Sequence, residues 1–413
     1  MKILIIGNGG REHAIGIKIL KDQPSAELFF AKGNGGTASI GTNINSQSVN
    51  ELVIFAKENK INITIVGSEA LLVEGIVDAF QQNGLSIFGP HQAAAMLEGD
   101  KAFAKLFMEE FGVRTAAYHA FTSPDNAILF LKNHSFPLVI KATGLAAGKG
   151  VFIVNNFDEG ESTIKSIMLE KSLGDAGNEI VIEEFLTGFE VSVLAVFNGE
   201  KIYPMISAKD HKKLLDNDEG PNTGGMGAVA PNPLYSTLLE EDFDRHILQP
   251  TLKGLKQRNL RFAGVIFFGL MICNNQCYLL EYNMRMGDPE TQAILPLLET
   301  DFLEIIENAT NNQPIEMQWK PMHSCSVVLA SNGYPGKIET EKFITGYENQ
   351  NENITVTIAG ATAKENHLFT SGGRVLNVTA ISETLSDAHQ QAYTKANEIN
   401  FEGKYYRKDI GLG

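Results

Sequence analysis

The chain has 413 residues, of which 43% are hydrophobic and 20% charged, and its formal net charge at pH 7 is -15. This composition is typical of a soluble globular protein, and the length exceeds what one compact core accommodates, so we expect about two to four domains. The acidic balance argues against proteins that track the phosphate backbone of nucleic acids, because these need basic stripes. A few local lysines would still suffice to bind a nucleotide.

The cysteines and apolar runs favour a cytoplasmic protein. The chain has 3 cysteines (Cys273, Cys277 and Cys325), an odd number too small for a disulfide framework, so a reducing compartment fits. Residues 1–6 lead straight into a glycine turn and predict a buried strand, not a signal peptide. No apolar run approaches the roughly 20 residues that cross a bilayer, so we expect no membrane association.

Residues 1–90 alternate short apolar runs with helical patterns. The expected strands are 2–6, 28–31, 63–66 and 85–88, and the expected helices are 13–20, 51–58 and 71–81. Such an alternation predicts βαβ units, and therefore a parallel sheet with flanking helices.

The turn from Gly7 to His13 opens the first expected helix, where dinucleotide-binding folds hold a pyrophosphate. The dinucleotide fingerprint fails, because Glu12 replaces its third glycine and the next strand ends at Lys32 without a carboxylate for ribose. A nicotinamide-dependent dehydrogenase is therefore disfavoured. Two interpretations stay open: a site for a single phosphate group on glycine amides, or a tight strand-to-helix turn alone.

A second glycine-rich segment, residues 144–150, lies between expected strands at 138–141 and 151–154, after helices expected at 102–111 and 125–133. A Walker loop would lead into a helix and carry Ser or Thr after its lysine, but Gly150 follows Lys149. The segment is therefore a hairpin loop. It is either a generic turn or a lid whose amides cover phosphates, with Lys141 beside the same phosphates.

Residues 179–196 combine expected strands at 179–184 and 191–196 around Gly188. An extended segment here suits the edge of an adenine, and Glu190 suits ribose hydroxyls, although an amphipathic strand with exposed acids fits as well. Residues 210–227 are polar and glycine-rich, and we expect a long ordered loop whose glycines allow close approach to a ligand. His211 is expected to be positional or at the surface.

The strand end at Glu281, Asn283 and Arg285 carries the strongest chemical pattern. It closes a hairpin expected from strands at 262–272 and 277–282, and alternate side chains of a strand share one face. Carboxylate and amide oxygens suit magnesium, and a guanidinium suits a phosphate or carboxylate. Taken alone, such a pattern is more often a solvated strand end.

The last quarter of the chain has a different pattern. After a helix expected at 300–310, short runs at 327–330, 355–359 and 374–379 predict a small β-rich domain that begins near Cys325. One late helix is expected at 385–399.

The order of these features is more specific than any one of them. A glycine lid, an adenine segment, a ribose acid, a glycine loop and the Glu-x-Asn pair follow one another as in ATP-grasp ligases. The segments 1–13, 97–105, 141–151, 220–228 and 281–292 resemble phosphoribosylamine–glycine ligase, the glycinamide ribonucleotide synthetase family, as do 371–376 and 407–411. The strings GPNTGGMGA and RMGDPETQ are the most specific, and the resemblance runs from the first residue nearly to the last.

This resemblance implies an ATP-grasp architecture of α/β and α+β domains. The implied parts are an N-terminal βαβ parallel-sheet domain at 1–100, an ATP-grasp region at 101–324 with a glycine-lid subdomain at about 122–192, and a small β-rich C-terminal domain at 325–413. The implied reaction joins glycine to 5-phosphoribosylamine in de novo purine biosynthesis. It gives glycinamide ribonucleotide, ADP and phosphate through a glycyl phosphate, with ATP as co-substrate and Mg²⁺, or Mn²⁺, as the metal.

The resemblance also implies roles for individual residues. The implied metal ligands are Glu281 and Asn283, and the implied reacting centre holds Arg285, Asp288 and Asp210. The implied ATP site comprises Lys105, Lys141, Gly144, Gly148, Lys149, Gly150, Glu183, Phe185, Leu186 and Glu190. Glycine and phosphoribosylamine are expected at Gly9, Gly10, Asn222, Thr223, Gly224, Gly225, Met226 and Arg374, with the sugar phosphate at Gly9, Gly10 and Arg374.

The expected partners are therefore small molecules, with neither nucleic acid nor membrane, and the protein is expected to be a monomer or a weak homodimer. Another carboxylate–amine or carboxylating ligase of purine synthesis is the nearest alternative, which the C-terminal strings disfavour. A non-catalytic nucleotide-binding regulator is a second alternative, which the presence of Glu281, Asn283 and Arg285 disfavours.

Overall fold

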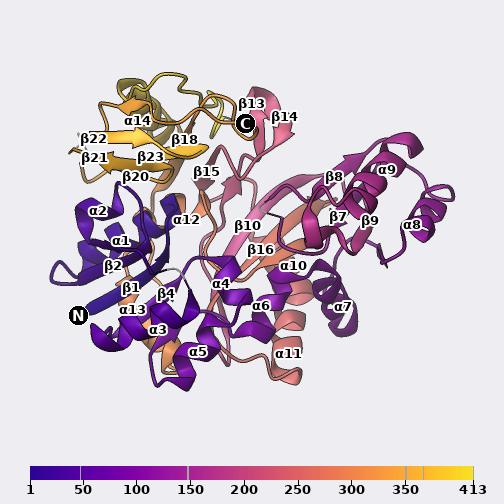
Figure 1. Ribbon diagram of the computed structural model, residues 1–413, viewed down its shortest axis with the longest axis horizontal. Coiled ribbons are helices and arrows are strands. Elements are labelled where there is room, and N and C mark those ends of the chain that lie inside the picture. Colours follow the sequence, from indigo (N-terminus) through magenta and orange to yellow (C-terminus); the bar gives the residue numbers. More distant parts are fainter. Residues whose placement is uncertain (47, 147, 349–350, 366, 413) are drawn as a thin grey trace.

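The N-terminal domain is built on a five-stranded parallel sheet in the order β3-β2-β1-β4-β5 (Figure 1). Its strands are β1 (Lys2–Gly7), β2 (Glu27–Lys32), β3 (Thr42–Ile44), β4 (Ile63–Val66) and β5 (Ile87–Phe88). Strand β1 is apolar throughout because Ile3 and Ile5 pack on one side of the sheet while Leu4 and Ile6 pack on the other. The predicted parallel sheet is confirmed. The pattern does not predict β3, in which Thr42 and Asn43 are polar.

Helices cover both faces of this sheet. They are α1 (Gly10–Asp22), α2 (Thr37–Ile40), α3 (Val49–Glu58), α4 (Glu69–Val73), α5 (Ile76–Gln82) and α6 (Gln92–Gly99). The single helix predicted at 71–81 is wrong, because Gly75 adopts φ +87° between α4 and α5 and the chain changes direction there. The short α2 and the alanine-rich α6 are additions to the predicted elements.

The lid subdomain is a four-stranded antiparallel sheet in the order β6-β9-β7-β8. Its elements are β6 (Tyr118–Phe121), α8 (Pro124–Leu131), β7 (Leu138–Ala142), β8 (Val151–Val154), α9 (Phe157–Ile164) with a π-helical turn (Lys165–Leu169), and β9 (Ile180–Glu184). Lys141 pairs with Val151 across β7 and β8, which confirms the glycine hairpin. Residue 147 of that hairpin lies outside the described residues, which are 1–46, 48–146, 148–348, 351–365 and 367–412 of this computed structural model.

The central sheet has the antiparallel order β11-β10-β16-β17. Its elements are β10 (Phe189–Asn198), β11 (Ile202–Pro204), β16 (Ala263–Cys273) and β17 (Gln276–Asn283), packed against α7 (Lys101–Phe111), α10 (Thr237–Phe243) and α11 (Gln249–Gln257). The predicted β16–β17 hairpin is confirmed. Gly269 pairs with Glu281 but Leu270 pairs with Leu279, so Leu280 is an extra residue. This bulge just before Glu281 re-aims the end of the strand.

The prediction of one long loop at 210–227 is wrong. The segment holds β12 (Lys209–Asp210), β13 (Lys213–Leu215), β14 (Glu219–Asn222) and the start of β15 (Gly227–Ala230). Strands β13 and β14 form a hairpin, whereas β12 and β15 join the sheet of the C-terminal domain. Strand β12 pairs with β15, and β15 pairs with β18 (His323–Ala330), which lies about a hundred residues downstream, so local sequence carries no signal for this pairing.

The C-terminal domain is β-rich with one long helix, as predicted. Its five-stranded sheet has the order β12-β15-β18-β23-β20, and a second sheet has the order β19-β22-β21. The remaining elements are β19 (Phe343–Ile344), β20 (Ile354–Ile358), β21 (Ala361–Lys364), β22 (His367–Thr370), β23 (Arg374–Ser382) and α14 (Leu385–Glu398). Helices α12 (Glu290–Ile294) and α13 (Phe302–Thr310) pack in the same apolar core as the N-terminal strand β1.

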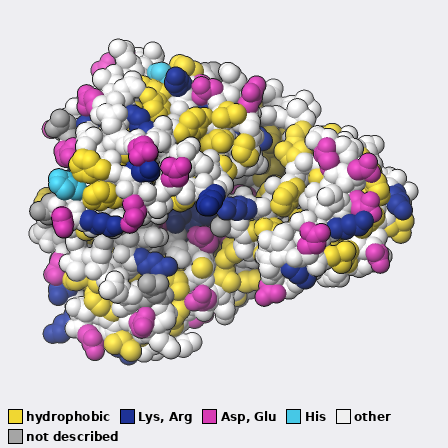
Figure 2. All heavy atoms as spheres, turned by 45° about the horizontal axis from the view of Figure 1, so that its top comes forward, with side chains coloured by type: hydrophobic (Ala, Val, Ile, Leu, Met, Phe, Trp, Pro, Cys, Tyr) yellow, Lys and Arg dark blue, Asp and Glu magenta, His cyan; other side chains and the backbone are white. Residues whose placement is uncertain are grey.

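The N-terminal and C-terminal domains lie side by side, and the lid subdomain projects away from them beyond the central sheet (Figure 1). Hydrogen bonds connect the N-terminal domain to the C-terminal domain. Ile358 N–H donates to His13 Nδ1 at 2.8 Å, and Asn34 Nδ2 donates to Ile358 O at 2.8 Å. Figure 2 shows lysine and arginine side chains gathered in the recess at the middle of the molecule. Within the described part of the chain, no helix is both long and apolar enough to span a membrane.

Candidate active site

One cavity of about 530 Å³ lies where the N-terminal domain, the lid subdomain, the central sheet and the C-terminal domain meet. Most of the predicted site residues line it, although they come from segments far apart in the chain. They are Lys105, Lys141, Gly148, Gly150, Glu183, Phe185, Leu186, Glu190, Asp210, Asn222, Thr223, Gly224, Glu281, Asn283, Arg285, Asp288 and Arg374.

Two buried lysines share one carboxylate at the lid side of the cavity. Glu183 on β9 lies 3.2 Å from Lys105 Nζ of α7 and 3.0 Å from Lys141 Nζ of β7. Burial and the nearby Lys141 outweigh Glu183 and lower the pKa of Lys105 to about 8. Lys105 also donates to Thr115 Oγ1 at 2.7 Å. The cluster has more positive than negative groups, so it is suited to an anion.

Glu281 faces several cations in the cavity. Burial by itself would raise its pKa, but Lys212, Lys141 and Lys101 together lower it. The carboxylate is therefore ionised at neutral pH. The sequence analysis assigned no role to Lys212 or Lys101, although Lys212 follows the predicted Asp210 by two residues.

Lys212 forms an ion pair with Glu190, at 2.6 Å between Nζ and Oε2. Burial would lower the pKa of Lys212, but Glu190, Glu281 and Asp210 raise it. The predicted ribose acid thus has a cation as its partner.

Arg285 is held from the N-terminal domain. Its Nη2 lies 2.8 Å from Glu98 Oε1 on α6, and its Nε lies 3.7 Å from Glu69 Oε2 on α4. Glu98 Oε2 also accepts a hydrogen bond from Met284 N–H at 2.6 Å. Burial raises the pKa of Glu98 despite Arg285. Arg285 also donates to Asn283 Oδ1 at 3.4 Å, so the predicted alternation places these two side chains together.

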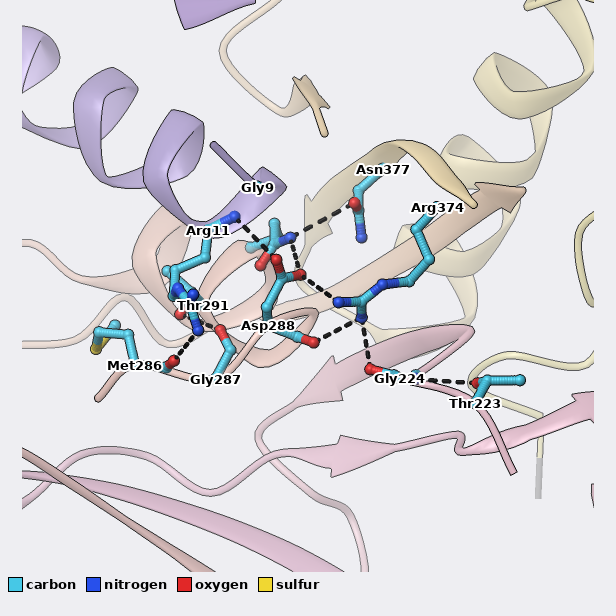
Figure 3. Close-up of polar contacts among 12 residues, drawn as sticks. Gly9, Arg11, Thr223, Gly224, Met286, Gly287, Asp288, Thr291, Arg374 and Asn377 are labelled. Carbon is cyan, nitrogen blue, oxygen red and sulfur yellow. Dashed lines mark hydrogen bonds and ion pairs between the residues drawn. The ribbon is translucent and has the colours of Figure 1, made fainter. Parts of the chain in front are cut away.

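Asp288 is the centre of a second network (Figure 3). Its Oδ1 accepts from Gln292 Nε2 at 2.8 Å and lies 3.6 Å from Arg374 Nη2, and its Oδ2 accepts from Arg11 N–H at 3.4 Å. Arg374 Nη1 also donates to the carbonyl oxygens of Asp288 and Gly224. Burial would raise the pKa of Asp288, but Arg374 and Arg11 lower it. Arg374 therefore connects the glycine loop to Asp288.

Two further carboxylates, the partly buried Asp210 and the buried Glu290, lie near each other. Burial raises the pKa of Asp210 well above its usual range, and Glu290 raises it further. Burial also raises the pKa of Glu290, whose Oε1 accepts from Ser192 Oγ at 3.0 Å. Two carboxylates of this kind favour sharing one proton.

The remaining predicted residues do not line the cavity. Gly144 packs against Ala176, Lys149 is exposed on the lid, and Gly225 lies against Asp210 and Pro289. Met226 is fully buried in the C-terminal core, so it supports the loop from behind.

Gly9 and Gly10 lie behind Asp288. Gly9 N–H donates to Glu12 Oε2 at 2.6 Å, and a side chain on Gly10 would meet Gln292 at 2.6 Å. The Glu12 carboxylate therefore occupies part of the phosphate site expected on the glycine amides, and it completes a capping box at the start of α1. His211 is buried, so it does not lie at the surface, and its Nδ1 donates to Gly227 O at 3.3 Å.

The donor set at the cavity fits a magnesium ion that is held partly by a substrate. Among the described residues, no group of three or more His, Cys, Asp or Glu side chains could hold a metal ion. Glu281 and Asn283 nevertheless offer one ionised carboxylate and one amide oxygen at the wall of the cavity. Magnesium is commonly bound by one or two such protein ligands together with phosphates and water.

Comparison with known proteins assigns the family. Residues 1–98 match the phosphoribosylglycinamide synthetase N domain, residues 99–291 its ATP-grasp (A) domain, and residues 324–413 its C domain. The chain belongs to the phosphoribosylglycinamide synthetase family. Phosphoribosylamine–glycine ligase of Fusobacterium nucleatum subsp. nucleatum is 50% identical over 418 residues, covering 100% of this chain and 98% of the relative. That of Clostridium acetobutylicum is 45% identical over 415 residues, covering 100% and 99%.

Solved structures agree with this assignment. The crystal structure of phosphoribosylamine–glycine ligase from Thermotoga maritima has a TM-score of 0.88 and 34% identity, covering 99% of this chain and 100% of that one. Biotin carboxylase from Campylobacter jejuni, in complex with a nucleotide, has a TM-score of 0.78 at 15% identity, covering 100% of this chain and 94% of that one. The second likeness shows the ATP-grasp fold alone, and it confirms the predicted fold class.

Proposed function

We propose that this protein joins glycine to 5-phosphoribosylamine at the expense of ATP, giving glycinamide ribonucleotide, ADP and phosphate. The observation that carries the proposal is the cavity of about 530 Å³ that is lined by the lid, the buried lysines, the Glu281–Asn283 pair and the Arg285–Asp288 strand end. Family membership along the whole chain supports the same reaction. The proposed activity is that of a C–N bond-forming ligase in purine biosynthesis.

We assign ATP to the lid side of the cavity. Phe185, Leu186 and the backbone at Glu183 would frame adenine, and Glu190 would accept hydrogen bonds from the ribose. Lys105 and Lys141 would bind phosphates, together with backbone amides of the lid from Gly144 to Gly150. The Glu183 carboxylate then has a further task, because it holds the two lysine ammonium groups 3.2 and 3.0 Å away.

The first chemical step would be attack by a glycine carboxylate oxygen on the γ-phosphorus of ATP. A carboxylate already ionised at neutral pH needs no base. The reaction brings negative charges together, so cationic groups must offset them, and Arg285, which is paired with Glu98, would be one of these groups. Mg²⁺, or alternatively Mn²⁺, held by Glu281 and Asn283 would neutralise charge on the phosphates.

The second step would be attack by the sugar amine on the carbonyl carbon of glycyl phosphate, which forms the amide bond and releases phosphate. We assign glycine and this amine to Asp210 and the glycine loop, where Asn222, Thr223 and Gly224 face the cavity. Arg374, with support from Gly9 and Gly10, is the candidate for the sugar phosphate. A closed lid would keep water from the acyl phosphate.

The proposed domain limits stay at 1–100, 101–324 and 325–413, with a lid at about 122–192. We further propose a cytoplasmic protein that acts on small molecules alone, as a monomer or a weak homodimer. Strands β12 and β15 nevertheless add chain from the middle region to the C-terminal sheet.

The test is a measurement of ADP release by purified protein with Mg²⁺, glycine and freshly prepared phosphoribosylamine. We expect release to require both substrates, and glycinamide ribonucleotide to form in equal amount. A parallel reaction with bicarbonate in place of glycine separates this ligase from a carboxylating one. Release that persists without glycine, or that bicarbonate supports instead, would refute the assignment.

A further inference from the structure

Residues 407–411 carry part of the family resemblance, yet the proposed function gives them no task. Arg407 at their start is 1% exposed. Its Nε and Nη2 donate to the two oxygens of Asp409, each at 2.7 Å. Its Nη1 donates to Lys213 O at 3.1 Å and to Asp218 Oδ1 at 2.8 Å. A planar guanidinium with a two-pronged contact on one segment and two contacts on another fixes the two segments relative to each other.

Further hydrogen bonds join the same two segments of the chain. Three of them, each 2.8 Å long, run from Lys408 N–H to Asp216 Oδ1, from Asn217 N–H to Asp409 Oδ2 and from Tyr405 Oη to Leu214 O. We call Tyr405, Arg407, Lys408 and Asp409 the C-terminal clamp. Burial would raise the pKa of Asp409, but the hydrogen bonds from Arg407 lower it to about 2. The ion pair at the centre of the clamp is therefore fully charged at neutral pH.

The clamp holds the hairpin of β13 and β14, which has little other support. In the described part of the chain these two strands form a sheet of their own. Leu214 packs against the C-terminal core, but Leu215 is 42% exposed and all four residues of β14 are exposed. A two-stranded hairpin by itself is only marginally stable in water. The position of this hairpin therefore depends on the clamp.

The hairpin leads directly into the glycine loop at 222–226. Lys213 is the cross-strand partner of Asn222, and Lys212 O accepts from both Thr223 N–H and Thr223 Oγ1 at 2.8 Å. The guanidinium of the clamp binds the Lys213 carbonyl, which is the next one along the chain. The first residues of the glycine loop line the cavity. A displaced hairpin would therefore move the wall to which we assigned glycine and the sugar amine.

We propose that Arg407 is a positioning residue for the glycine and sugar-amine half of the site, acting through the hairpin on the glycine loop. The inference rests on the proposed function and adds to it a residue outside the lining of the cavity. The loop is held independently from its other side, because Gly224 N–H donates to Tyr334 Oη at 2.9 Å and Gly224 O accepts from Arg374. The clamp supplies the second anchor, and a loop held at both sides keeps one conformation.

The ATP side of the cavity should not depend on the clamp. Lys105, Lys141 and Glu183 lie on α7, β7 and β9, whereas the side-chain hydrogen bonds of Arg407 and Tyr405 end on the hairpin or within the clamp. A misplaced hairpin should therefore weaken binding of glycine and the amine and leave ATP binding intact. A general loss of folded protein acts differently, because it lowers kcat and leaves every KM unchanged. The three KM values thus separate positioning from stability.

The first experiment compares Arg407→Met and Arg407→Lys with wild type. Each KM is measured by ADP release while the other two substrates are saturating. In Arg407→Met we expect KM for glycine and KM for the amine each to rise about 10-fold, with KM for ATP near wild type. Arg407→Lys keeps the charge but not the two-pronged contact, so it should recover part of this loss.

A matched pair of variants on the hairpin keeps the test decisive if a change at the buried Arg407 impairs folding. Asp218 has 63% of its side chain exposed and φ +54°, a conformation that asparagine also adopts, so Asp218→Asn removes only a charge from the partner of Arg407. KM for glycine and KM for the amine should each rise about 3-fold. Glu219→Gln removes the same charge one residue further on, outside the contacts of the clamp, and should match wild type.

A second measurement uses the protein without substrates. In hydrogen–deuterium exchange followed by mass spectrometry, residues 212–226 should exchange faster in Arg407→Lys and Asp218→Asn than in wild type, because their anchor is weakened. Strand β9 of the lid should exchange as in wild type. Glu219→Gln should match wild type in both regions.

The outcomes are separable. Wild-type ADP release that requires neither glycine nor the amine refutes the proposed function. An active wild type with three unchanged KM values in both Arg407→Lys and Asp218→Asn refutes the positioning role. An equal rise in all three KM values refutes the restriction to the glycine and amine half of the site. Unchanged exchange at 212–226 refutes the hold of the clamp on the hairpin.

Discussion

The buried contact between Glu98 and Arg285 gives a quantitative prediction for the variants Glu98→Ala and Glu98→Gln. Glu98 is 8% exposed and uses both oxygens, one for Arg285 Nη2 at 2.8 Å and one for Met284 N–H at 2.6 Å. Alanine removes both acceptors and leaves a buried guanidinium and a buried amide poorly paired. Breaking a buried pair in this way costs about 3–5 kcal/mol of unfolding free energy.

Glutamine keeps one oxygen for Met284 N–H but turns an amide NH₂ toward Arg285. The lost interaction is one charge-assisted hydrogen bond, worth about 1.5–3 kcal/mol. Burial raises the pKa of Glu98, so its ionised form is held at some cost that glutamine does not incur. We therefore expect Glu98→Gln to lose only about 1–2 kcal/mol. Both variants release one anchor of Arg285, and kcat should fall about 10–100-fold in each.

Equilibrium urea unfolding and steady-state ADP release measure the two effects. Glu110→Ala is the matched control, because Glu110 pairs with Arg258 at the surface, where 47% of its side chain is exposed. It should change unfolding free energy by less than about 1 kcal/mol and leave kcat unchanged. If Glu98→Ala costs no more than Glu110→Ala, the burial argument is wrong. If Glu98→Gln keeps wild-type kcat, Arg285 does not depend on Glu98.

Three further predictions concern the metal, pH and backbone. Glu281→Ala should abolish turnover and the Mg²⁺-dependent part of ADP binding while the thermal unfolding midpoint stays near wild type; unchanged turnover would remove Glu281 from the metal site. Burial lowers the pKa of His13 from 6.5 to about 4, so as the pH falls this histidine is protonated in the unfolded chain before it is protonated in the folded protein. The stability that the neutral His13 side chain contributes is therefore present above pH 6.5 and is lost as the pH falls toward 4. Between pH 7 and pH 5, the unfolding free energy of His13→Asn in urea titrations should therefore fall by about 2 kcal/mol less than that of wild type. An equal fall in the two proteins would contradict this prediction. Gly225 has φ +108°, and a Cβ there would lie 2.4 Å from Pro289 Cδ, so Gly225→Ala should lower both kcat and the unfolding free energy. Gly84 is the control, because it has φ +71° but no atom within 4 Å of its Cβ position. Gly84→Ala should lower the unfolding free energy by about 1 kcal/mol and leave the activity unchanged.

The sequence by itself determined the elements whose signals are local. Continuous apolar runs predicted the parallel strands β1, β2 and β4, and the strand patterns at 262–272 and 277–282 predicted the β16–β17 hairpin. The lid hairpin followed from glycines between two strand patterns. Hydrophobic periodicity and turn-forming residues act over a few neighbouring residues, so a single sequence is enough to recognise them. The motif strings predicted the family, because they are distributed along the whole chain.

Only the tertiary structure decided which charged groups meet. Glu98 and Arg285 are 187 residues apart, and Lys212 reaches Glu190 from the link between β12 and β13. The same is true of Arg374, which joins Asp288 to the glycine loop. Strand β15 forms because β18 lies beside it, and β12 forms because it pairs with β15 in turn. A residue's partner depends on long-range packing and burial, which no local pattern encodes.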